Sequence, residues 1–420
     1  MNHATRNESE DHAGDRPTSR HVVVLAQSAP YPPPLIGGQI RIERIARSVA
    51  ATGPTTFFCV SDVDEDEIRK GWNGAGLFED VRSFKPDLKA PTRDPRWGAW
   101  WRTIAAAFPY TVPPSHRVHW STTLVETLRS IRQKNTVVLA SRAWMAEMAH
   151  AAGIERIVVD MADLESRLWA QSMAQLPRSY RHSFHKAQLR HLTRYEQRLP
   201  MRFSRVIVTK ESDCSFFLPD LRHRVIVAPN GVDPVRDAKQ SHGAILLFVG
   251  ALGYEPNTDA ALWFSERVLP LISARYPAAL FRVVGRGPAP ILWGARMRML
   301  GVDVVESPTS LNEYYANAAV AVVPLFVGEG TSLKAAEAMS HALPLVSTAV
   351  GVRGFPLTAN EHYLLANEPE DFADACCRVL ENPAAFREMT LRSKELVDQQ
   401  FDWLSVSKPI VEAINALADG

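Results

Sequence analysis

The chain has 420 residues, of which 46% are hydrophobic and 22% charged, and its formal net charge is +1 at pH 7. This length predicts two domains rather than one compact core, and the balanced charge argues against a nucleic-acid partner. No two of the four cysteines form a CxxC pair, which excludes a disulfide framework and a cysteine zinc site and fits a reducing cytosol.

Residues 1–19 are polar and lack the apolar segment of a signal peptide, so a disordered tail is predicted. From residue 20 onward, short apolar runs alternate with amphipathic helical stretches. The runs predicted as buried strands are "HVVVLA", "TTFFCV", "NTVVLAS", "RIVVD", "RVIV" and "RVIVA". The repeating strand–helix order predicts a doubly wound parallel sheet, that is, a Rossmann-like domain over residues 20–237.

The same order restarts after the aperiodic segment "DPVRDAKQSHG", which is predicted to be a linker. Strands are expected in "AILLFVG", "ALFRVVG", "VDVVES", "VAVVPLF" and "LPLVST", within a second doubly wound domain over residues 242–403. Residues 404–420 are predicted to form a helix. Two such domains imply a ligand cleft lined by loops at the carboxyl ends of the strands.

Two glutamates flank the start of a predicted helix in "GEGTSLKAAEAMSHALPLVST". Glu329 precedes the helix in a glycine-containing loop, and Glu337 lies one to two turns inside it. Gly328 and Gly330 permit close approach of a ligand, Thr331 or Ser332 can cap the helix, and the helix N-terminus suits a phosphate.

Carboxylates this far apart are poorly placed for acid–base chemistry on one bond. They suit two separate diols, such as the hexose and ribose hydroxyls of a nucleotide sugar. The alternative is one capping acid and one solvated acid. The strand–glycine–helix–strand context favours the functional interpretation.

The Glu–x7–Glu spacing resembles the donor-site motif of retaining glycosyltransferases of the family-four kind (glycosyl transferases group 1), which have the two-domain GT-B fold. Other segments resemble this family as well: "APYPPPLIGGQIR", "VIVAPNGVD", "FVGALGYEPNTDAALWF", "FRVVGRGP" and "SLNEYYANAAVAVVPL". The resemblance is close over the C-terminal half and patchier over the N-terminal half. It therefore implies a C-terminal donor domain and an N-terminal acceptor-side domain.

The resemblance implies transfer of a hexose from a nucleotide-diphosphate sugar to an acceptor hydroxyl, with retention and with no required metal or cofactor. By position, Glu329 contacts the sugar and Glu337 the ribose, while Gly37 and Gly38 let their loop close on the diphosphate. Asn230 and Gly231 shape the interdomain turn, and the final helix crosses back to the first domain. The role of many relatives suggests surface or exported polysaccharide synthesis, with a carbohydrate or lipid-linked acceptor.

The chain departs from the family where an Arg and a Lys usually neutralise the diphosphate, because Ala251 and Pro256 hold those positions. Lys334 is the best replacement as a catalytic cation; its alternative is a simple ion pair with Glu337. Ala162 stands where relatives often carry a histidine. Arg41 either supplies charge to the cleft or lies on the surface of its helix.

Basic residues recur at i, i+4 spacing within 178–205, at Lys186, Arg190, Arg194, Arg198 and Arg202. This stripe fits either peripheral contact with anionic lipid or a solvated helix face. No apolar run reaches membrane-spanning length, so a cytoplasmic protein is predicted, with any membrane contact peripheral at the inner face.

The main functional prediction is thus an active retaining hexosyltransferase. A catalytically silent GT-B module that binds a nucleotide sugar or a partner glycosyltransferase is the alternative, motivated by the missing Arg/Lys pair. A nucleotide-sugar epimerase is less favoured, because the paired glutamates resemble the transferase group more. A dehydrogenase is excluded, because no GxGxxG follows the first strand.

Overall fold

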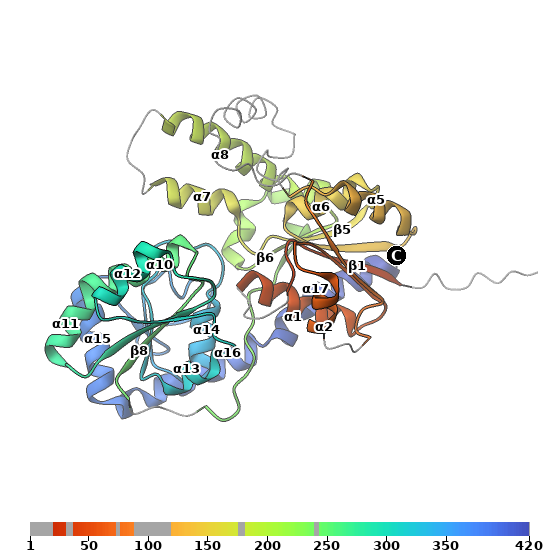
Figure 1. Ribbon diagram of the computed structural model, residues 1–420. Helices are drawn as coiled ribbons and strands as arrows, with labels where there is room; N and C mark the ends of the chain where they lie inside the picture. Colours follow the sequence, from red (N-terminus) through yellow and green to blue (C-terminus); the bar gives the residue numbers. More distant parts are fainter. Residues whose placement is uncertain are drawn as a thin grey trace, which may run out of the picture.

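A computed structural model describes residues 20–30, 37–72, 76–87, 119–174, 181–238 and 243–419. Figure 1 shows two α/β domains side by side, each built on one parallel sheet. The predicted pair of doubly wound domains is therefore confirmed. The tail over residues 1–19 lies outside the described residues.

The first domain has a seven-stranded sheet in the order β3-β2-β1-β4-β5-β6-β7, with all neighbours parallel. Its strands are uniformly apolar where helices cover both faces, as in β1, whose Val22 to Ala26 are all buried. The strands are β1 (His21–Ala26), β2 (Thr55–Val60), β3 (Asp80–Phe84), β4 (Thr136–Ser141), β5 (Arg156–Asp160), β6 (Arg205–Val208) and β7 (Val225–Val227).

Successive residues of β1 face two different helical layers. Val22 and Val24 share a core with Ile42 of α1 (Gly37–Ala50) and Ile410 of α17 (Trp403–Asp419). Val23 packs on the opposite layer, formed by α5 (Thr122–Ile131) and α6 (Ala143–Ala151). The helices of this half are α1 (Gly37–Ala50), α2 (Glu65–Gly71), α5 (Thr122–Ile131), α6 (Ala143–Ala151), α7 (Glu165–Ala174), α8 (Arg181–Gln197) and α9 (Leu199–Arg202), with short 3-10 helices η1 (Glu211–Phe216) and η2 (Pro219–Arg224).

The second domain has a six-stranded parallel sheet in the order β10-β9-β8-β11-β12-β13. Its strands are β8 (Ile245–Val249), β9 (Leu280–Gly285), β10 (Asp303–Glu306), β11 (Val320–Val323), β12 (Leu345–Ser347) and β13 (Leu364–Leu365). The remaining elements are α10 (Glu255–Trp263), the π-helical η3 (Phe264–Val268), α11 (Leu269–Arg275), α12 (Ile291–Met299), α13 (Asn312–Asn317), α14 (Leu333–Ser340), α15 (Pro369–Glu381), η4 (Pro383–Phe386), α16 (Arg387–Gln400) and α17 (Trp403–Asp419).

The chain passes between the domains twice, and the two passages lie side by side. Val232 on the outward passage forms a bridge with Asp402 on the return, and its amide donates to the carbonyl of Phe401 at 2.7 Å. After this point α17 packs against α1 and β4 of the first domain. Figure 1 shows the blue α17 beside the red α1.

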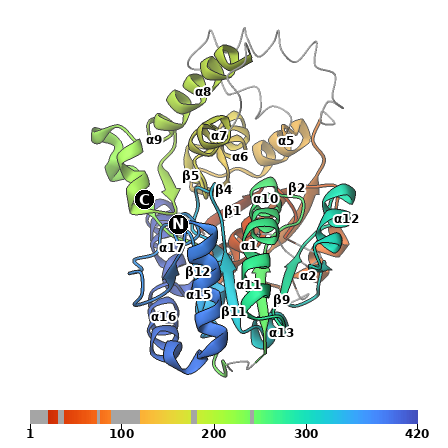
Figure 2. The ribbon, with the colours of Figure 1, turned by 90° about the vertical axis from the view of Figure 1, so that its left-hand side faces the viewer.

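The basic segment 178–205 forms no single continuous helix. α8 ends at Gln197 and α9 begins at Leu199, so the predicted i, i+4 stripe is interrupted, and Arg202 forms an ion pair with Glu147 at 2.7 Å. Figure 2 shows α8 projecting beyond α7, away from the second domain. Among the described residues, no helix combines the length and apolar character needed to span a bilayer.

Candidate functional site

The loop that joins β11 to α14 lies at the boundary between the domains. We call residues 328–332 the glutamate loop. A Cβ added at Gly330 would lie 2.5 Å from an Asp163 carboxylate oxygen, at the carboxyl end of β5. Glycine therefore lets the second domain approach the first here without displacing the Asp163 side chain.

Glu329 is 7% exposed, and side chains of both domains contact its carboxylate. The ammonium of Lys210 lies 3.1 Å from Oε2 and also donates to the Glu329 main-chain carbonyl. Gln171 of α7 donates to Oε1, and its own amide oxygen accepts from the Gly328 N–H at 3.1 Å. Arg353, from the same domain as Glu329, is 3.6 Å away.

Lys210 and Gln171 were not among the residues singled out from the sequence. Lys210 offers one usable signal, because it follows β6 at the carboxyl edge of the sheet, where ligand-facing residues of doubly wound domains collect. Gln171 offers none, because its position on α7 does not distinguish it from other polar residues of that helix.

Glu337 lies in the second turn of α14, on a separate cavity of about 340 Å³. Tyr315 donates a hydrogen bond of 2.7 Å to its carboxylate, and the ring of His341 stacks on Tyr315. Burial raises the pKa of Glu337 to about 7, against the opposing effects of the Tyr315 hydroxyl and Lys334. Trp403 and Arg44 also line the cavity, which therefore lies beside the crossing point of the domains.

Lys334 turns toward the end of β8. Its ammonium donates to the Asn257 side-chain oxygen at 2.6 Å and lies 4.4 Å from the centroid of the Phe248 ring. Burial lowers the pKa of Lys334 to about 7, although the charge of Glu337 opposes this shift. Within the described residues, Lys334 and Glu337 do not form an ion pair with each other. Lys334 binds Asn257 and Glu337 binds Tyr315, so the alternative role predicted for Lys334, a simple ion pair with Glu337, does not form.

The start of α1 meets the start of α14. Helix α1 begins at Gly37, and a Cβ added there would lie 3.1 Å from a methyl group of Leu333, the first residue of α14. Gly38 is less crowded, with Gln27 as its nearest neighbour at 3.9 Å. The predicted glycine loop and the glutamate loop are thus neighbours in space.

Thr331 is held by the interdomain turn. The Asn230 amide donates to the Thr331 hydroxyl, and the Asn230 side chain donates to the Thr331 carbonyl, both at 2.8 Å. Ser332 occupies the N-cap position of α14, but its hydroxyl makes no capping bond. The prediction that Thr331 or Ser332 caps α14 with its side chain is therefore wrong. The Thr331 hydroxyl instead accepts a hydrogen bond from Asn230, and the Ser332 hydroxyl makes no capping bond.

Gly231 lies directly under the Trp403 ring, and a Cβ added there would be 2.7 Å from ring atoms. This close approach brings the outward and return passages of the chain together. Packing against Trp403 therefore explains why a glycine occupies position 231, independently of any ligand.

Arg41 neither supplies charge to the cleft nor lies on the surface. It is 2% exposed and binds both Asp160 carboxylate oxygens, at 2.8 and 2.9 Å. Its remaining N–H groups donate to the carbonyls of Ala228 and Pro229, each at 2.9 Å, and to the Asn230 side chain. Arg41 therefore fixes the segment that leads into the interdomain turn.

The carboxyl ends of β4 and β5 contribute a second charged pair. Arg142 has a positive φ of 84° and lies 3.5 Å from Asp163. Ala162, at the predicted histidine position, accepts a hydrogen bond on its carbonyl from Thr209. Burial and the charge of Asp163 raise the pKa of Tyr254, which belongs to the loop after β8 in the other domain. Within the described part of the chain, no group of three or more His, Cys, Asp or Glu could hold a metal ion.

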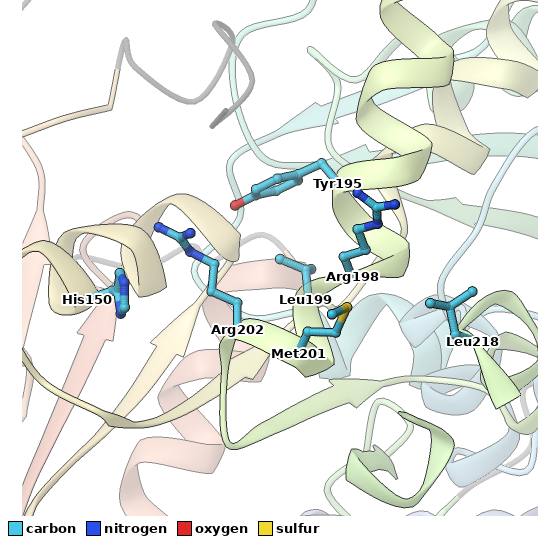
Figure 3. Close-up of a pocket in the computed structure, with 7 residues that line it drawn as sticks. All are labelled: His150, Tyr195, Arg198, Leu199, Met201, Arg202 and Leu218. Atoms are coloured by element: carbon cyan, nitrogen blue, oxygen red, sulfur yellow. The ribbon is translucent and has the colours of Figure 1, made fainter. Parts of the chain in front are cut away.

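A further cavity, of about 680 Å³, lies elsewhere on the first domain (Figure 3). His150 at the end of α6 and residues of α8 and α9 line it, so it lies near the amino ends of β5 and β6. Tyr195 and Arg202, on its wall, both contact the buried Glu147. None of the predicted site residues lines this cavity.

Residues 243–382 match the family model described as Glycosyl transferases group 1. An uncharacterized 44.6 kDa protein in the cps region of Klebsiella pneumoniae is 22% identical over 168 residues, which is 38% of this chain and 43% of that protein. The chain therefore spans less than half the length of this relative.

Solved structures resemble both domains of the chain. HepE of Anabaena, in complex with UDP-glucose, has a TM-score of 0.65 and 12% identity, over 94% of this chain and 100% of HepE. A TarM variant of S. aureus, in complex with Fondaparinux, alpha-GlcNAc-glycerol and UDP, has a TM-score of 0.63 and 10% identity, over 94% of this chain and 100% of TarM. The protein has the GT-B fold, and its match to Glycosyl transferases group 1 supports a GT-B glycosyltransferase.

Proposed function

We propose that the protein transfers a hexose from a nucleotide-diphosphate sugar to an acceptor hydroxyl with retention of anomeric configuration. The bond between the hexose C1 and the diphosphate breaks, and its electron pair leaves with the diphosphate. A bond from C1 to the acceptor oxygen forms on the same face, and the acceptor proton passes to the departing phosphate or to solvent. The barrier lies in the oxocarbenium-like centre and the departing charge.

The observation that carries this proposal is the placement of the two glutamates. Glu329 faces the first domain among Lys210, Gln171 and Arg353, whereas Glu337 lies on the 340 Å³ cavity beside the linker. We assign the Glu329 carboxylate to the hexose hydroxyls and the Glu337 carboxylate to the ribose. A diphosphate between them would pass the start of α14.

The groups at the start of α14 suit a diphosphate. The helix begins without a capping side chain, so its first N–H groups are available to an anion, and Gly37 brings the start of α1 alongside. Lys334 would supply charge by leaving Asn257. This would compensate for Ala251 and Pro256, which carry no cation.

We further propose a role in surface or exported polysaccharide synthesis. The relative in a cps region supports it, and the UDP-glucose and UDP bound to HepE and TarM support a nucleotide-sugar donor. The acceptor would be a carbohydrate or a lipid-linked saccharide reached on the cytoplasmic side, with segment 178–205 as the candidate peripheral membrane contact.

A thermal-shift screen tests donor binding. UDP, GDP, ADP, TDP and CDP sugars would be compared on the wild type, on Glu337→Ala and on Glu412→Ala, a control whose side chain is 66% exposed on α17. We expect one nucleotide class to raise the Tm of the wild type and of the control but not of Glu337→Ala. A folded wild type that no donor stabilises would contradict donor binding.

Product stereochemistry tests the reaction itself. With the donor identified, anomer-resolved NMR of the product should show the donor configuration. An inverted product would exclude the retaining mechanism while leaving transfer established.

A catalytically silent module is the second candidate. Lys334 and Glu337 already bind Asn257 and Tyr315 within the protein, and the usual Arg/Lys pair is absent. If this candidate is right, the protein should bind the donor but transfer no sugar to any acceptor tested. It should also bind a partner glycosyltransferase.

A further inference from the structure

We propose that Lys210 and Gln171 are positioning residues that aim the Glu329 carboxylate at the hexose, and that closure of the two domains brings them into place. The inference rests on the proposed function, because it assigns Glu329 to the reacting sugar. Neither residue belongs to the glutamate motif, and both come from the opposite domain.

Lys210 binds the glutamate loop at two points from a buried position. It is 4% exposed, and its ammonium donates to both the carboxylate and the main-chain carbonyl of Glu329. Asp213 lies 3.6 Å away on its other side and is itself paired with Arg167. Side chains of alternating charge therefore run from Arg167 in the first domain through Asp213 and Lys210 to Glu329, so Lys210 has a carboxylate on each side.

Gln171 fixes the same loop through its two amide atoms. Its NH2 group donates to the Glu329 carboxylate, and its oxygen accepts from the N–H of Gly328. Gln171 thus holds the side chain of one loop residue and the backbone of the preceding one. The two contacts restrict the rotation of Glu329 about its side-chain bonds.

The second domain leaves space for these incoming side chains. Gly354 has a φ of 90°, and a Cβ there would lie 2.8 Å from Cγ of Lys210 and 2.5 Å from a methyl carbon of Thr331. A larger residue would push against the aliphatic part of Lys210. The glycine therefore lets Lys210 reach Glu329 when the domains are close.

Separating the domains would remove both contacts at once. Of the charged side chains that the structure describes, Glu329 would then keep Arg353 alone, which is 3.6 Å away and 40% exposed. An open enzyme would have a loosely held carboxylate, and a closed one a fixed carboxylate in a site from which water is excluded. Coupling the aim of Glu329 to closure would limit hydrolysis of the donor while the site is open.

The test compares Lys210→Met and Gln171→Met with Lys408→Met, the same lysine change at a 75% exposed site on α17. The probe is UDP-glucose, or the panel sugar that the wild type turns over. We expect each positioning variant to lower kcat by roughly 10²-fold, the scale of a 1 Å misplacement. The KM for the donor and the Kd of the nucleoside diphosphate should stay within about twofold, because neither residue faces the Glu337 cavity.

A double-mutant cycle separates positioning from general damage. In a Glu329→Gln background, Lys210→Met should cause little further loss, because the group that it aims is already altered. Lys210→Met leaves the Asp213 carboxylate without its lysine neighbour, which could destabilise the fold. The double variant Lys210→Met, Asp213→Asn removes this problem, and it should show the same loss of kcat as Lys210→Met with the Tm of the wild type.

The outcomes distinguish the two proposals. An unchanged kcat in both positioning variants, or losses that multiply with that of Glu329→Gln, would overturn the positioning role and leave the transferase intact. Loss of donor affinity with unchanged kcat would also overturn it, because Lys210 would then be a donor ligand. A wild type that turns over no panel sugar would instead refute the proposed function, and this inference with it.

Discussion

Glu337 and Lys334 lie one turn apart on α14, and burial shifts both toward their neutral forms. The pKa of Glu337 rises from 4.5 to about 7, so the folded protein binds more protons than the unfolded chain between these pH values. This contribution to stability is lost as the pH rises through that window. Lys334, whose pKa falls from 10.5 to about 7, has the opposite sign, and its contribution is lost as the pH falls from 10.5 to 7.

Glu337→Gln should remove the first of these two dependences. The Tm of this variant minus the Tm of the wild type should increase by roughly 2–4 °C between pH 5 and pH 8, because only the wild type loses stability through Glu337 in that range. Differential scanning fluorimetry at four pH values measures it, with the exposed Glu412→Gln as the control. A constant Tm difference across the range would show that Glu337 does not titrate there.

Lys334→Met addresses the diphosphate. If Lys334 leaves Asn257 to bind the diphosphate, its loss should weaken nucleoside diphosphate binding by about tenfold and nucleoside binding hardly at all. Isothermal titration with UDP and uridine, or with the pair that the donor screen selects, compares the two. Equal weakening of both ligands would remove Lys334 from the diphosphate site.

Single residues could be predicted from the sequence where a local pattern contained the information. Glu329 lies in the glycine-containing loop before α14 and Glu337 in the second turn of that helix, so the local pattern was enough to predict where each one lies in the chain. Their partners could not be predicted in this way. Lys210 and Gln171 are separated from Glu329 by 119 and 158 residues, and only the packing of the two domains brings them to its carboxylate.

At the scale of elements, Gly231 lets the outward and return passages between the domains lie close together. Gly231→Ala would place a methyl group 2.7 Å from the ring of Trp403, so we expect a loss of about 1–3 kcal/mol in the free energy of unfolding. Urea denaturation measures it. Gly253→Ala is the matched control, because no atom lies within 4 Å of the added Cβ.

A second variant distinguishes crowding from a change in backbone freedom. Gly231→Ala should lower the free energy of unfolding by less in a Trp403→Leu background than in the wild type, because the smaller leucine side chain leaves room for the added methyl group. Full additivity of the two costs would mean that Gly231 and Trp403 do not interact.

Strands were easier to predict than helix ends. Uniformly buried runs such as Val137–Ala140 reflect burial on both faces of a parallel sheet, and that signal is local. Helix ends depend on partners from elsewhere. Ser332 has the residue type of a cap but makes no capping bond, and Asn230, about a hundred residues earlier, engages Thr331 instead. The break between α8 and α9 was likewise hidden by the regular spacing of the basic residues.

At the scale of the molecule, α17 completes the core of the first domain. Ile410 and Ile414 are fully buried in the same cluster as Val22 and Ile42. Ile414→Ala should therefore cost about 2–5 kcal/mol. Hydrogen exchange should show lost protection in α1 and β1, while the second domain keeps its own. Leu404→Ala on the same helix is the control, because that side chain is 77% exposed.

The two-domain architecture could be predicted because its signal repeats along the chain: apolar strand, helical stretch and the next strand, restarting after the linker. How the two sheets face each other could not, because it depends on side chains that cross the boundary, such as Arg286 donating to Gln39. Loss of protection in the second domain rather than the first, in the Ile414→Ala experiment, would contradict the packing of α17.

The double passage also sets the order in which the domains can mature during synthesis. The ribosome completes every strand of the first domain before it begins the second, yet α17 is made after the last strand of the second domain. The apolar side chains that pack against α17, such as Ile42 and Ile45, therefore lack this covering helix while the second domain is translated. Trp403 and Val406 at the start of α17 belong to the core of the second domain, whereas Ile410 and Ile414 further along belong to that of the first, so the domain that is synthesised first is the last to complete its core.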